Sequence, residues 1–402
     1  MQPWFVHLAG AQDIAWALDE DLAWVKRSLD DRCRWTTLPG AKIIHAAWPA
    51  AIATVRDSAL RGKTIVCQAD NPPAFYLSLG GFDRIAQRVD LWIARSTEAE
   101  EQFRLLGLPV VRVPYSVDPE IFRPLGDREN IRKSLGVSPD AFVIGNFHRD
   151  SEGSDLGKPK LQKGPDVFLD IARELHKRVP NMHVLLAGPR RHWLVNALRS
   201  AAIPVVFAGQ EPGKGDDYPQ NILSRARLNE LYQALDVCVI SSRWEGGPYS
   251  VLEALAAGCS VISTPLGTSR DVLPDDCLFN EAERAVELLA LAATSGSLEN
   301  ICSAAAGKAA STHGPVAVAR ALQDVYAELP AGSPSPAHVI RSAVGCVAGR
   351  FLGVPKTLPE ESVPGFGSEE LSLSSFDGRD CRTREDLDVL AGHIRSVLAV
   401  QQ

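Results

Sequence analysis

The stretch Ser241 to Ser260, SSRWEGGPYSVLEALAAGCS, decides how this chain is organised. It follows an apolar run, Val237 to Ile240, of the kind that forms a strand buried on both faces of a parallel sheet. The EGGP segment is a flexible turn that ends in a residue suited to the first position of a helix. We therefore predict a strand, a glycine turn, and a helix over Tyr249 to Ala257 that Gly258 closes.

The turn and the start of the helix form a predicted anion site. In an open parallel sheet such a turn lies at the carboxyl ends of the strands, where the amides of the new helix attract a phosphate. Gly246, Gly247 and Pro248 would border that phosphate. Glu245 stays in the turn, whereas Glu253 lies about 7.5 Å of helix rise beyond Pro248. The layout fits a sugar at Glu245, a diphosphate at the helix start and a ribose at Glu253.

Glu253 has a simpler interpretation as a solvated helix residue. Its neighbours from Val251 to Ala257 are apolar or alanine, so the helix has no obvious charged face. A lone carboxylate is costly to bury without partners. The sequence therefore favours a ligand-binding role for Glu253.

The two glutamates, with EGGP before and LEALAAG after, resemble the motif of the retaining glycosyltransferases of family 4 (glycosyl transferases group 1). In that family the first glutamate contacts the donor sugar, the second holds the ribose, and backbone amides between them bind the diphosphate. The resemblance implies that Tyr249 and Ser250 supply those amides. It extends over residues 1–325 and implies the α/β GT-B fold, with two Rossmann-like parallel-sheet domains that face each other across a cleft.

Two cations are expected at the same sheet edge. Arg149 follows the apolar run Phe142 to Phe147, and Lys163 precedes Gly164-Pro165, the predicted start of the next helix. Both could be ordinary surface charges, but the resemblance matches them to the family's phosphate-binding pair. Preplaced cations stabilise the charge that develops on a departing diphosphate. The resemblance also implies that no metal and no cofactor beyond the donor is needed.

The first half alternates apolar runs with helical stretches, which is typical of a parallel α/β sheet. Gly10 follows the first run and is expected near the cleft. Gln68 and Asp70 stand where many relatives carry a histidine close to the reacting sugar, so either is a candidate at the acceptor. Asp70 beside Asn71-Pro72 is equally typical of a turn. His45 is interpreted as a packed strand histidine.

The domain boundaries follow the proline-rich segments. The sequence VPYSVDPEIFRP after the last run of the first half is a stiff crossover, so we expect a first, acceptor-side domain over 1–125. A second, nucleotide-sugar domain is expected over 139–329. A linker then leads to an extension over 337–402 of unknown role, predicted to be helical and packed back on the first domain, with a membrane-surface helix as the alternative.

Composition limits the partners and the compartment. A net charge of −7 over 402 residues argues against a general nucleic-acid binder. The eight cysteines have no paired spacing suited to zinc and are expected to be reduced core thiols. The first residues lack a secretory signal, and no run is long enough to span a membrane. We expect a cytoplasmic protein with at most peripheral contact with the inner membrane face.

The sequence thus predicts a metal-independent retaining glycosyltransferase of the hexosyltransferase type, active in glycan biosynthesis. It would move a sugar from a UDP- or GDP-sugar to a saccharide, lipid-linked or small-molecule acceptor. Two alternatives remain open: a nucleotide-sugar epimerase or sugar phosphorylase on the same fold, and a non-catalytic nucleotide-binding subunit.

Overall fold

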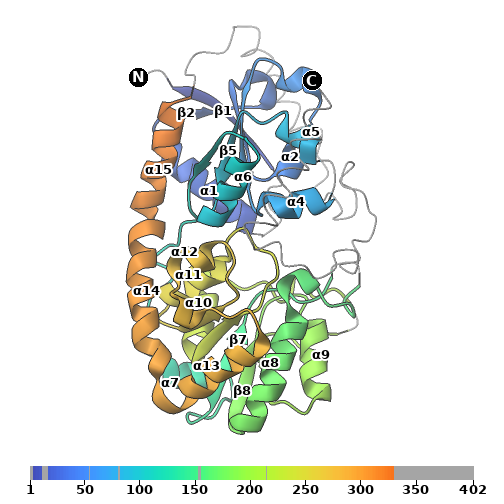
Figure 1. Cartoon of the computed structure of the whole chain (residues 1–402), viewed down its shortest axis with the longest axis vertical. Helices are drawn as coiled ribbons and strands as arrows, with labels where there is room; N and C mark the ends of the chain where they lie inside the picture. The colour runs from blue at the N-terminus through green and yellow to red at the C-terminus, as the bar shows by residue number, and fades with distance from the viewer. Residues whose placement is uncertain are drawn as a thin grey trace. The chain divides into compact units, whose positions relative to one another are not determined.

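The structure is a computed structural model that describes residues 3–10, 17–53, 55–79, 82–152, 155–213 and 215–329. The chain divides into two compact units (Figure 1). The first holds the chain up to Tyr115 and again from Val318, and the second is Ser116–Ala317. Each unit is built around one parallel sheet, as the sequence predicts.

The first unit contains a six-stranded sheet with the order β2-β1-β3-β4-β5-β6, in which every neighbouring pair is parallel. Its strands are β1 Trp4–Ala9, β2 Cys33–Trp35, β3 Ile43–Ala46, β4 Thr64–Ala69, β5 Leu91–Ala94 and β6 Val110–Arg112. Its helices are α1 Ala17–Leu29, α2 Pro49–Ala53, α3 Asp57–Leu60, α4 Pro73–Leu79, α5 Phe82–Ala86, α6 Thr97–Leu105 and α15 Pro315–Ala327, with a 3₁₀ turn, η1, at Leu38–Gly40.

Two apolar clusters cover the two faces of this sheet. One face packs on α1 and α15, where Trp4 and Tyr326 meet edge to face with their ring centres 5.6 Å apart. The opposite face packs on the helices between β3 and β6, where Trp92 and Phe103 stack at 4.8 Å. Both faces of the central strands β3, β4 and β5 are buried because helices cover both sides of the sheet, so these strands are mostly apolar.

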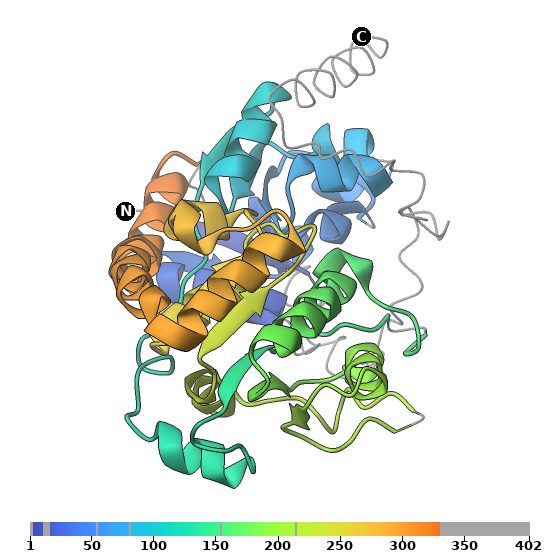
Figure 2. The same ribbon diagram turned by 60° about the horizontal axis from the view of Figure 1, so that its bottom comes forward.

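The second unit contains a five-stranded parallel sheet with the order β11-β10-β7-β8-β9. Its strands are β7 Phe142–Asn146, β8 Met182–Leu186, β9 Val205–Phe207, β10 Val237–Ile240 and β11 Ser260–Ser263. Its helices are α7 Arg128–Ser134, α8 Pro165–Arg178, α9 His192–Ser200, α10 Arg225–Ala234, α11 Tyr249–Ala256, α12 Thr268–Val272, α13 Ala282–Ser295 and α14 Ser297–His313, with 3₁₀ turns η2 at Leu161–Lys163 and η3 at Asp275–Cys277. Helices α8 and α9 lie side by side in both views (Figure 1, Figure 2).

Helix α15 groups differently from the sequence prediction. Residues 318–329 were assigned to the second domain, but Val318, Leu322 and Tyr326 are buried in the core of the first unit. The contact division also falls after Tyr115, ahead of the expected boundary at 125. The apolar stripe of α15 is visible in the sequence, but a stripe does not say which sheet it covers. The predicted extension over 337–402 lies outside the described residues.

Candidate functional site

The site predicted from the sequence lies at the switch point of the second sheet. Strand β7 pairs with β8 on one side and with β10 on the other, so the chain reverses its direction of winding between β7 and β10. Ligands of doubly wound sheets bind outside the carboxyl ends of the strands at such a point. The loop after β7 carries Arg149 and Lys163, and the loop after β10 carries Glu245.

The two loops are joined directly. The backbone amide of Arg243 donates to the Gln162 carbonyl at 2.8 Å, and the Ser241 hydroxyl donates to the Gly164 carbonyl at 2.8 Å. Gly164 has a left-handed φ of 60°, and a Cβ there would lie 1.8 Å from the Ser241 carbonyl oxygen. Only glycine allows this approach, because any side chain would collide with backbone.

Lys163 and Glu245 form an ion pair between these loops. The Lys163 ammonium contacts Oε1 of Glu245, and the Ser242 hydroxyl donates to the same oxygen at 2.9 Å. The side chains remain 20% and 13% exposed, so the pair is shielded but accessible. The structure thus brings together two residues that are 82 positions apart and that the sequence placed at one sheet edge.

Arg149 is half-buried and lies three residues after Asn146, the last residue of β7. Asp150 and Arg191 form a buried ion pair at 2.9 Å, and Arg191 also donates to the Asn146 side chain at 2.7 Å. Burial, together with the positive charges of Arg191 and Lys163, holds the pKa of His148 well below its usual range. His148 is therefore neutral beside the two expected phosphate-binding cations.

The helix that follows the glycine turn begins where the sequence predicts, at Tyr249. Pro248, which the sequence suggests for the first helical position, is instead the N-cap of α11, with φ −69° and ψ 111°. The proline ring cannot cap the helix by a hydrogen bond, so the first backbone amides need other partners. Gly246 and Gly247 are buried, and Ser250 is half-buried.

The far end of α11 agrees with the sequence prediction. The helix ends at Ala256, Ala257 is its cap, and Gly258 follows with a left-handed φ of 81°. Gly267, in the loop after β11, approaches the Gly246 carbonyl very closely. A Cβ on Gly267 would lie 2.4 Å from that oxygen. The glycine turn is therefore packed between the loops after β7 and β11.

Glu253 lies on α11 against a buried tyrosine. The Tyr232 hydroxyl donates to Glu253 Oε2 at 3.1 Å, and burial together with the Glu253 charge raises the pKa of Tyr232 well above its usual range. The Tyr232 ring packs edge to face on Phe147 and Phe122, with ring centres 5.0 and 6.3 Å apart. Glu253 is thus half-buried and held in place, which differs from the solvated alternative.

The candidates of the first unit have structural partners of their own. Gly10 follows β1 at the switch point of the first sheet, where a Cβ would lie 3.0 Å from the Ala47 Cβ. Gln68 is 1% exposed, and its amide donates to His45 Nε2 at 2.7 Å. Asp70 accepts hydrogen bonds from the Tyr76 hydroxyl and from the Asn71 side chain. Such local bonds are what the turn interpretation of Asp70 predicts.

His45 is a packed strand histidine, as interpreted from the sequence. It is fully buried, and its Nδ1 lies 2.9 Å from the Tyr326 hydroxyl. Since its Nε2 accepts from Gln68, the proton of the neutral ring sits on Nδ1. Burial, aided by the charge of Arg95, lowers the pKa of His45 to about 3.

The described residues limit the metal, redox and membrane chemistry of the chain. The six cysteines there are free and buried, as expected of core thiols, and these are Cys33, Cys67, Cys238, Cys259, Cys277 and Cys302. Within the same ranges, no cluster of three or more His, Cys, Asp or Glu side chains is arranged to hold a metal ion. None of the described helices combines the length and the apolarity needed to cross a membrane.

Comparison with known sequences supports the glycosyltransferase class that the sequence predicts. Residues 156–294 match the family model described as Glycosyl transferases group 1. The lipopolysaccharide core biosynthesis mannosyltransferase LpsB of Rhizobium meliloti is 25% identical over 198 residues, which is 47% of this chain and 49% of that protein. D-inositol 3-phosphate glycosyltransferase 2 of Catenulispora acidiphila is 29% identical over 204 residues, 47% of this chain and 43% of that protein. The matches span about half the length of these relatives.

Comparison with solved structures establishes the fold. A structure of Anabaena HepE in complex with UDP-glucose is similar with a TM-score of 0.66 at 14% identity, covering 81% of this chain and all of that one. WaaG, a glycosyltransferase involved in lipopolysaccharide biosynthesis, is similar with a TM-score of 0.58 at 14% identity and the same coverage. The chain has the GT-B fold expected from the sequence, and residues 156–294 carry the predicted likeness to glycosyl transferases of group 1.

Four residues around the site were not predicted. Ser242 holds Glu245, Tyr232 holds Glu253, and Asp166 pairs with Arg243 to join the two loops. Ser242 and Arg243 lie inside the stretch Ser241 to Ser260, but a polar residue beside a predicted site is a weak signal of function. Tyr232 and Asp166 carry no local signal, because their partners are 21 and 77 positions away.

Proposed function

We propose that this chain is a retaining glycosyltransferase of family 4 that moves a sugar from a nucleoside-diphosphate sugar to an acceptor hydroxyl without a bound metal. The observation that carries the proposal is the Lys163–Glu245 pair at the β7–β10 switch point, beside the start of α11. A cation, a carboxylate and a helix start in one place suit a sugar diphosphate.

Each residue has a proposed role in donor binding. The amides of Tyr249 and Ser250 bind the diphosphate, and Arg149 and Lys163 neutralise its charge. Glu245 orients the donor sugar through its hydroxyls, with Ser242 fixing the carboxylate. Glu253 accepts hydrogen bonds from the ribose hydroxyls while Tyr232 holds it from behind. Because His148 is neutral, the balance of the diphosphate charge falls to the two cations.

The proposed chemistry exchanges one bond to the anomeric carbon for another. The bond from that carbon to the diphosphate oxygen breaks, and the acceptor oxygen forms a new bond from the same face of the sugar. The departing phosphate oxygen takes the proton of the acceptor hydroxyl, so no separate base is needed. Arg149, Lys163 and the α11 amides stabilise the charge that grows on the leaving diphosphate, a kind of contribution worth a few kcal/mol per group.

The donor class is supported by the UDP-glucose bound in the HepE structure, and the acceptor class stays a saccharide, lipid-linked or small-molecule hydroxyl compound. We place the enzyme in the cytoplasm with at most peripheral contact with a membrane. Gly10, Gln68 and Asp70 remain proposals for the acceptor side, although the burial of Gln68 means that its amide must turn outward to reach a ligand.

The test measures nucleoside-diphosphate release from UDP- and GDP-sugars with and without candidate acceptors. A transferase releases diphosphate in proportion to a new glycoside with the anomeric configuration of the donor. An epimerase converts the donor without release, and a non-catalytic subunit binds UDP or GDP without turnover. Inverted product, or activity that disappears with a chelator and returns with a divalent ion, contradicts the retaining or metal-independent parts of the proposal.

A further inference from the structure

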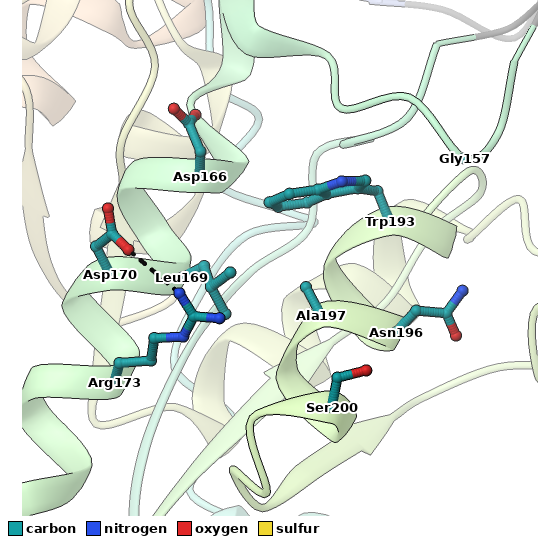
Figure 3. Close-up of a pocket in the computed structure, with 9 residues that line it drawn as sticks. All are labelled: Gly157, Asp166, Leu169, Asp170, Arg173, Trp193, Asn196, Ala197 and Ser200. Atoms are coloured by element: carbon teal, nitrogen blue, oxygen red, sulfur yellow. Dashed lines mark ion pairs between the residues drawn. The ribbon is translucent and has the colours of Figure 1, made fainter.

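A ligand-sized hollow lies between α8 and α9. It has a volume of about 530 Å³, within the range of small-molecule sites. Figure 3 shows its walls, with Asp166, Leu169, Asp170 and Arg173 on one helix and Trp193 with Asn196, Ala197 and Ser200 on the other. We call it the α8–α9 groove.

Both helices present the same spacing to the groove. On α8 the other lining residues stand three, four and seven positions after Asp166, and on α9 they stand three, four and seven positions after Trp193. Such positions form one continuous stripe on a helix. Leu169 and Ala197 form an apolar floor, whereas the rim residues Asn196 and Ser200 are exposed and polar. The groove is therefore a narrow apolar floor between two hydrogen-bonding edges.

Trp193 closes one end of the groove. Its indole is half-buried and extends from the start of α9 across to α8, beneath the loop that carries Gly157 (Figure 3). Its backbone amide donates to the Ser151 hydroxyl at 3.0 Å, which fixes the base of the side chain. A fixed, half-exposed indole is a large apolar platform on which a flat ligand can stack at little entropic cost.

The charges of the groove are already balanced. Arg243 pairs with Asp166 through both carboxylate oxygens at 2.8 and 2.7 Å, and Arg173 pairs with Asp170 at 3.6 Å. A phosphate would meet two carboxylates, and a polyamine would have to compete with two arginines. A neutral ligand with many hydroxyls disturbs neither pair and can still hydrogen-bond to carboxylate, guanidinium and amide.

We propose that the α8–α9 groove binds a saccharide. One apolar face of a pyranose ring would pack on Trp193, and its hydroxyls would bond to Asp170, Arg173 and Asn196. This site is separate from the proposed donor site, and its ligand class does not rest on transferase activity. It touches the donor loop through one shared residue, Asp166, whose pairing with Arg243 joins the two regions.

The experiment titrates the full chain with neutral pyranosides, measured by isothermal calorimetry and ligand-observed NMR. The probes are the methyl α-glycosides of glucose, mannose, galactose and N-acetylglucosamine, and maltose. We expect saturable binding of at least one probe that Trp193→Ala weakens by roughly tenfold or more. The double variant Asn196→Ala/Ser200→Ala replaces exposed side chains only, so it tests the rim without risk to folding, and should weaken binding several-fold.

Controls separate the groove from the rest of the molecule. Trp24→Ala removes another half-buried tryptophan, on α1, and should leave saccharide binding unchanged. Lys163→Ala should leave it unchanged as well, and Trp193→Ala should leave UDP binding unchanged. The proposal is overturned if no probe saturates the native chain, if spermidine or inorganic phosphate binds at the groove instead, or if Lys163→Ala removes saccharide binding while Trp193→Ala does not.

Discussion

Asp166 and Arg243 meet through two parallel hydrogen bonds of 2.8 and 2.7 Å, which join the first turn of α8 to the loop after β10. Arg243 also donates to the Leu161 carbonyl at 2.9 Å, so one guanidinium fixes the turn that carries Lys163. Although burial acts to raise the pKa of Asp166, the hydrogen bonds and the charge of Arg243 lower it overall. The pair orders the site without itself touching the proposed donor.

Arg243→Lys should therefore impair turnover while the protein stays folded. A lysine cannot form the planar two-bond contact, so the Lys163 turn loses its anchor. We expect kcat for sugar transfer to fall by about tenfold, since small displacements of a catalytic group are costly. Arg178→Lys, at an exposed position on α8, the helix that carries Asp166, is the matched control and should change neither kcat nor KM. An unchanged kcat in Arg243→Lys contradicts a positioning role for this pair.

Lys163→Ala should reduce transfer by a factor of roughly 10² to 10³, because one electrostatic partner of the leaving diphosphate is lost. Glu245→Gln should also lose activity, and the double variant should lose less than the product of the two, since the residues are in direct contact. Lys160→Ala removes a nearby lysine that precedes the turn and is expected to retain activity. If the loss of activity in the double variant equals the product of the two single losses, Lys163 and Glu245 do not act as a coupled pair.

Glu253→Gln should weaken recognition of the ribose. The native chain should bind UDP more tightly than a UDP analogue without ribose hydroxyls, and the variant should lose most of that difference, about tenfold in Kd. Tyr232→Phe removes only the hydroxyl that holds Glu253, so it should give a smaller loss of the same discrimination. Calorimetric titration with UDP and with the analogue measures the ratio of the two Kd values in each protein. If Glu253→Gln has the same ratio as the native chain, the ribose does not bind at Glu253.

Gly164→Ala tests the close approach of the two loops. Its Cβ would lie 1.8 Å from the Ser241 carbonyl oxygen, so the loops must separate, and we expect a loss of several kcal/mol in unfolding free energy together with activity. Gly136→Ala is the control, because Gly136 has a similar φ of 69° but open space around its Cβ position. It should cost only the backbone strain, about 1 kcal/mol. Urea denaturation measures the unfolding free energy of both variants. If Gly164→Ala loses no more than Gly136→Ala, backbone strain alone explains its destabilisation, and the approach of the two loops is not close.

His45 predicts a pH dependence of stability. Above about pH 6.5 the ring is neutral in the folded and the unfolded chain, so His45 adds no pH dependence. Between about pH 6.5 and the folded pKa of about 3, the unfolded chain binds a proton at His45 that the folded chain does not. The free energy of unfolding therefore decreases as the pH is lowered through this range. The slope from this residue should approach 1.4 kcal/mol per pH unit at most.

The check is urea denaturation from pH 7.5 to 4 of the native chain and of His45→Asn, which cannot take up the proton. The slope should be shallower in the variant by about the amount contributed by one group. His183→Asn, on a half-buried strand position in the second unit, serves as the control. If the native chain and His45→Asn have parallel profiles, His45 is not the group that titrates.

The fold was predictable because helices cover both faces of the central strands. Val237–Ile240 is continuously apolar and buried, and its bounds agree with the structure. Trp4–Ala9 is apolar except for His7 and contains both buried and half-buried positions. Strand β2, Cys33–Trp35, was not predicted because it has only three residues, with the exposed Arg34 in its middle. The equally short edge strand β9, Val205–Phe207, has no charged residue and therefore shows as an apolar run.

The candidate site was predictable to the level of which loops meet. A parallel sheet sends its strand ends to one edge, so Lys163 and Glu245 were expected together and are in contact. The partners that hold them were not predictable, because Tyr232, Asp166 and the Gln162 carbonyl meet their partners across the fold and have no periodic pattern. In the first unit, Gln68 lies inside β4 rather than after it, and its side chain faces His45 and the core.

Helix α15 has a consequence for the order in which the protein forms during synthesis. One face of the first sheet takes its cover from Val318, Leu322 and Tyr326, which leave the ribosome only after the whole of Ser116–Ala317 has been made. The amino-terminal strands must wait with an apolar face open while the later unit acquires all of its own sequence. The half of the chain that is translated first is therefore the half that finishes folding last.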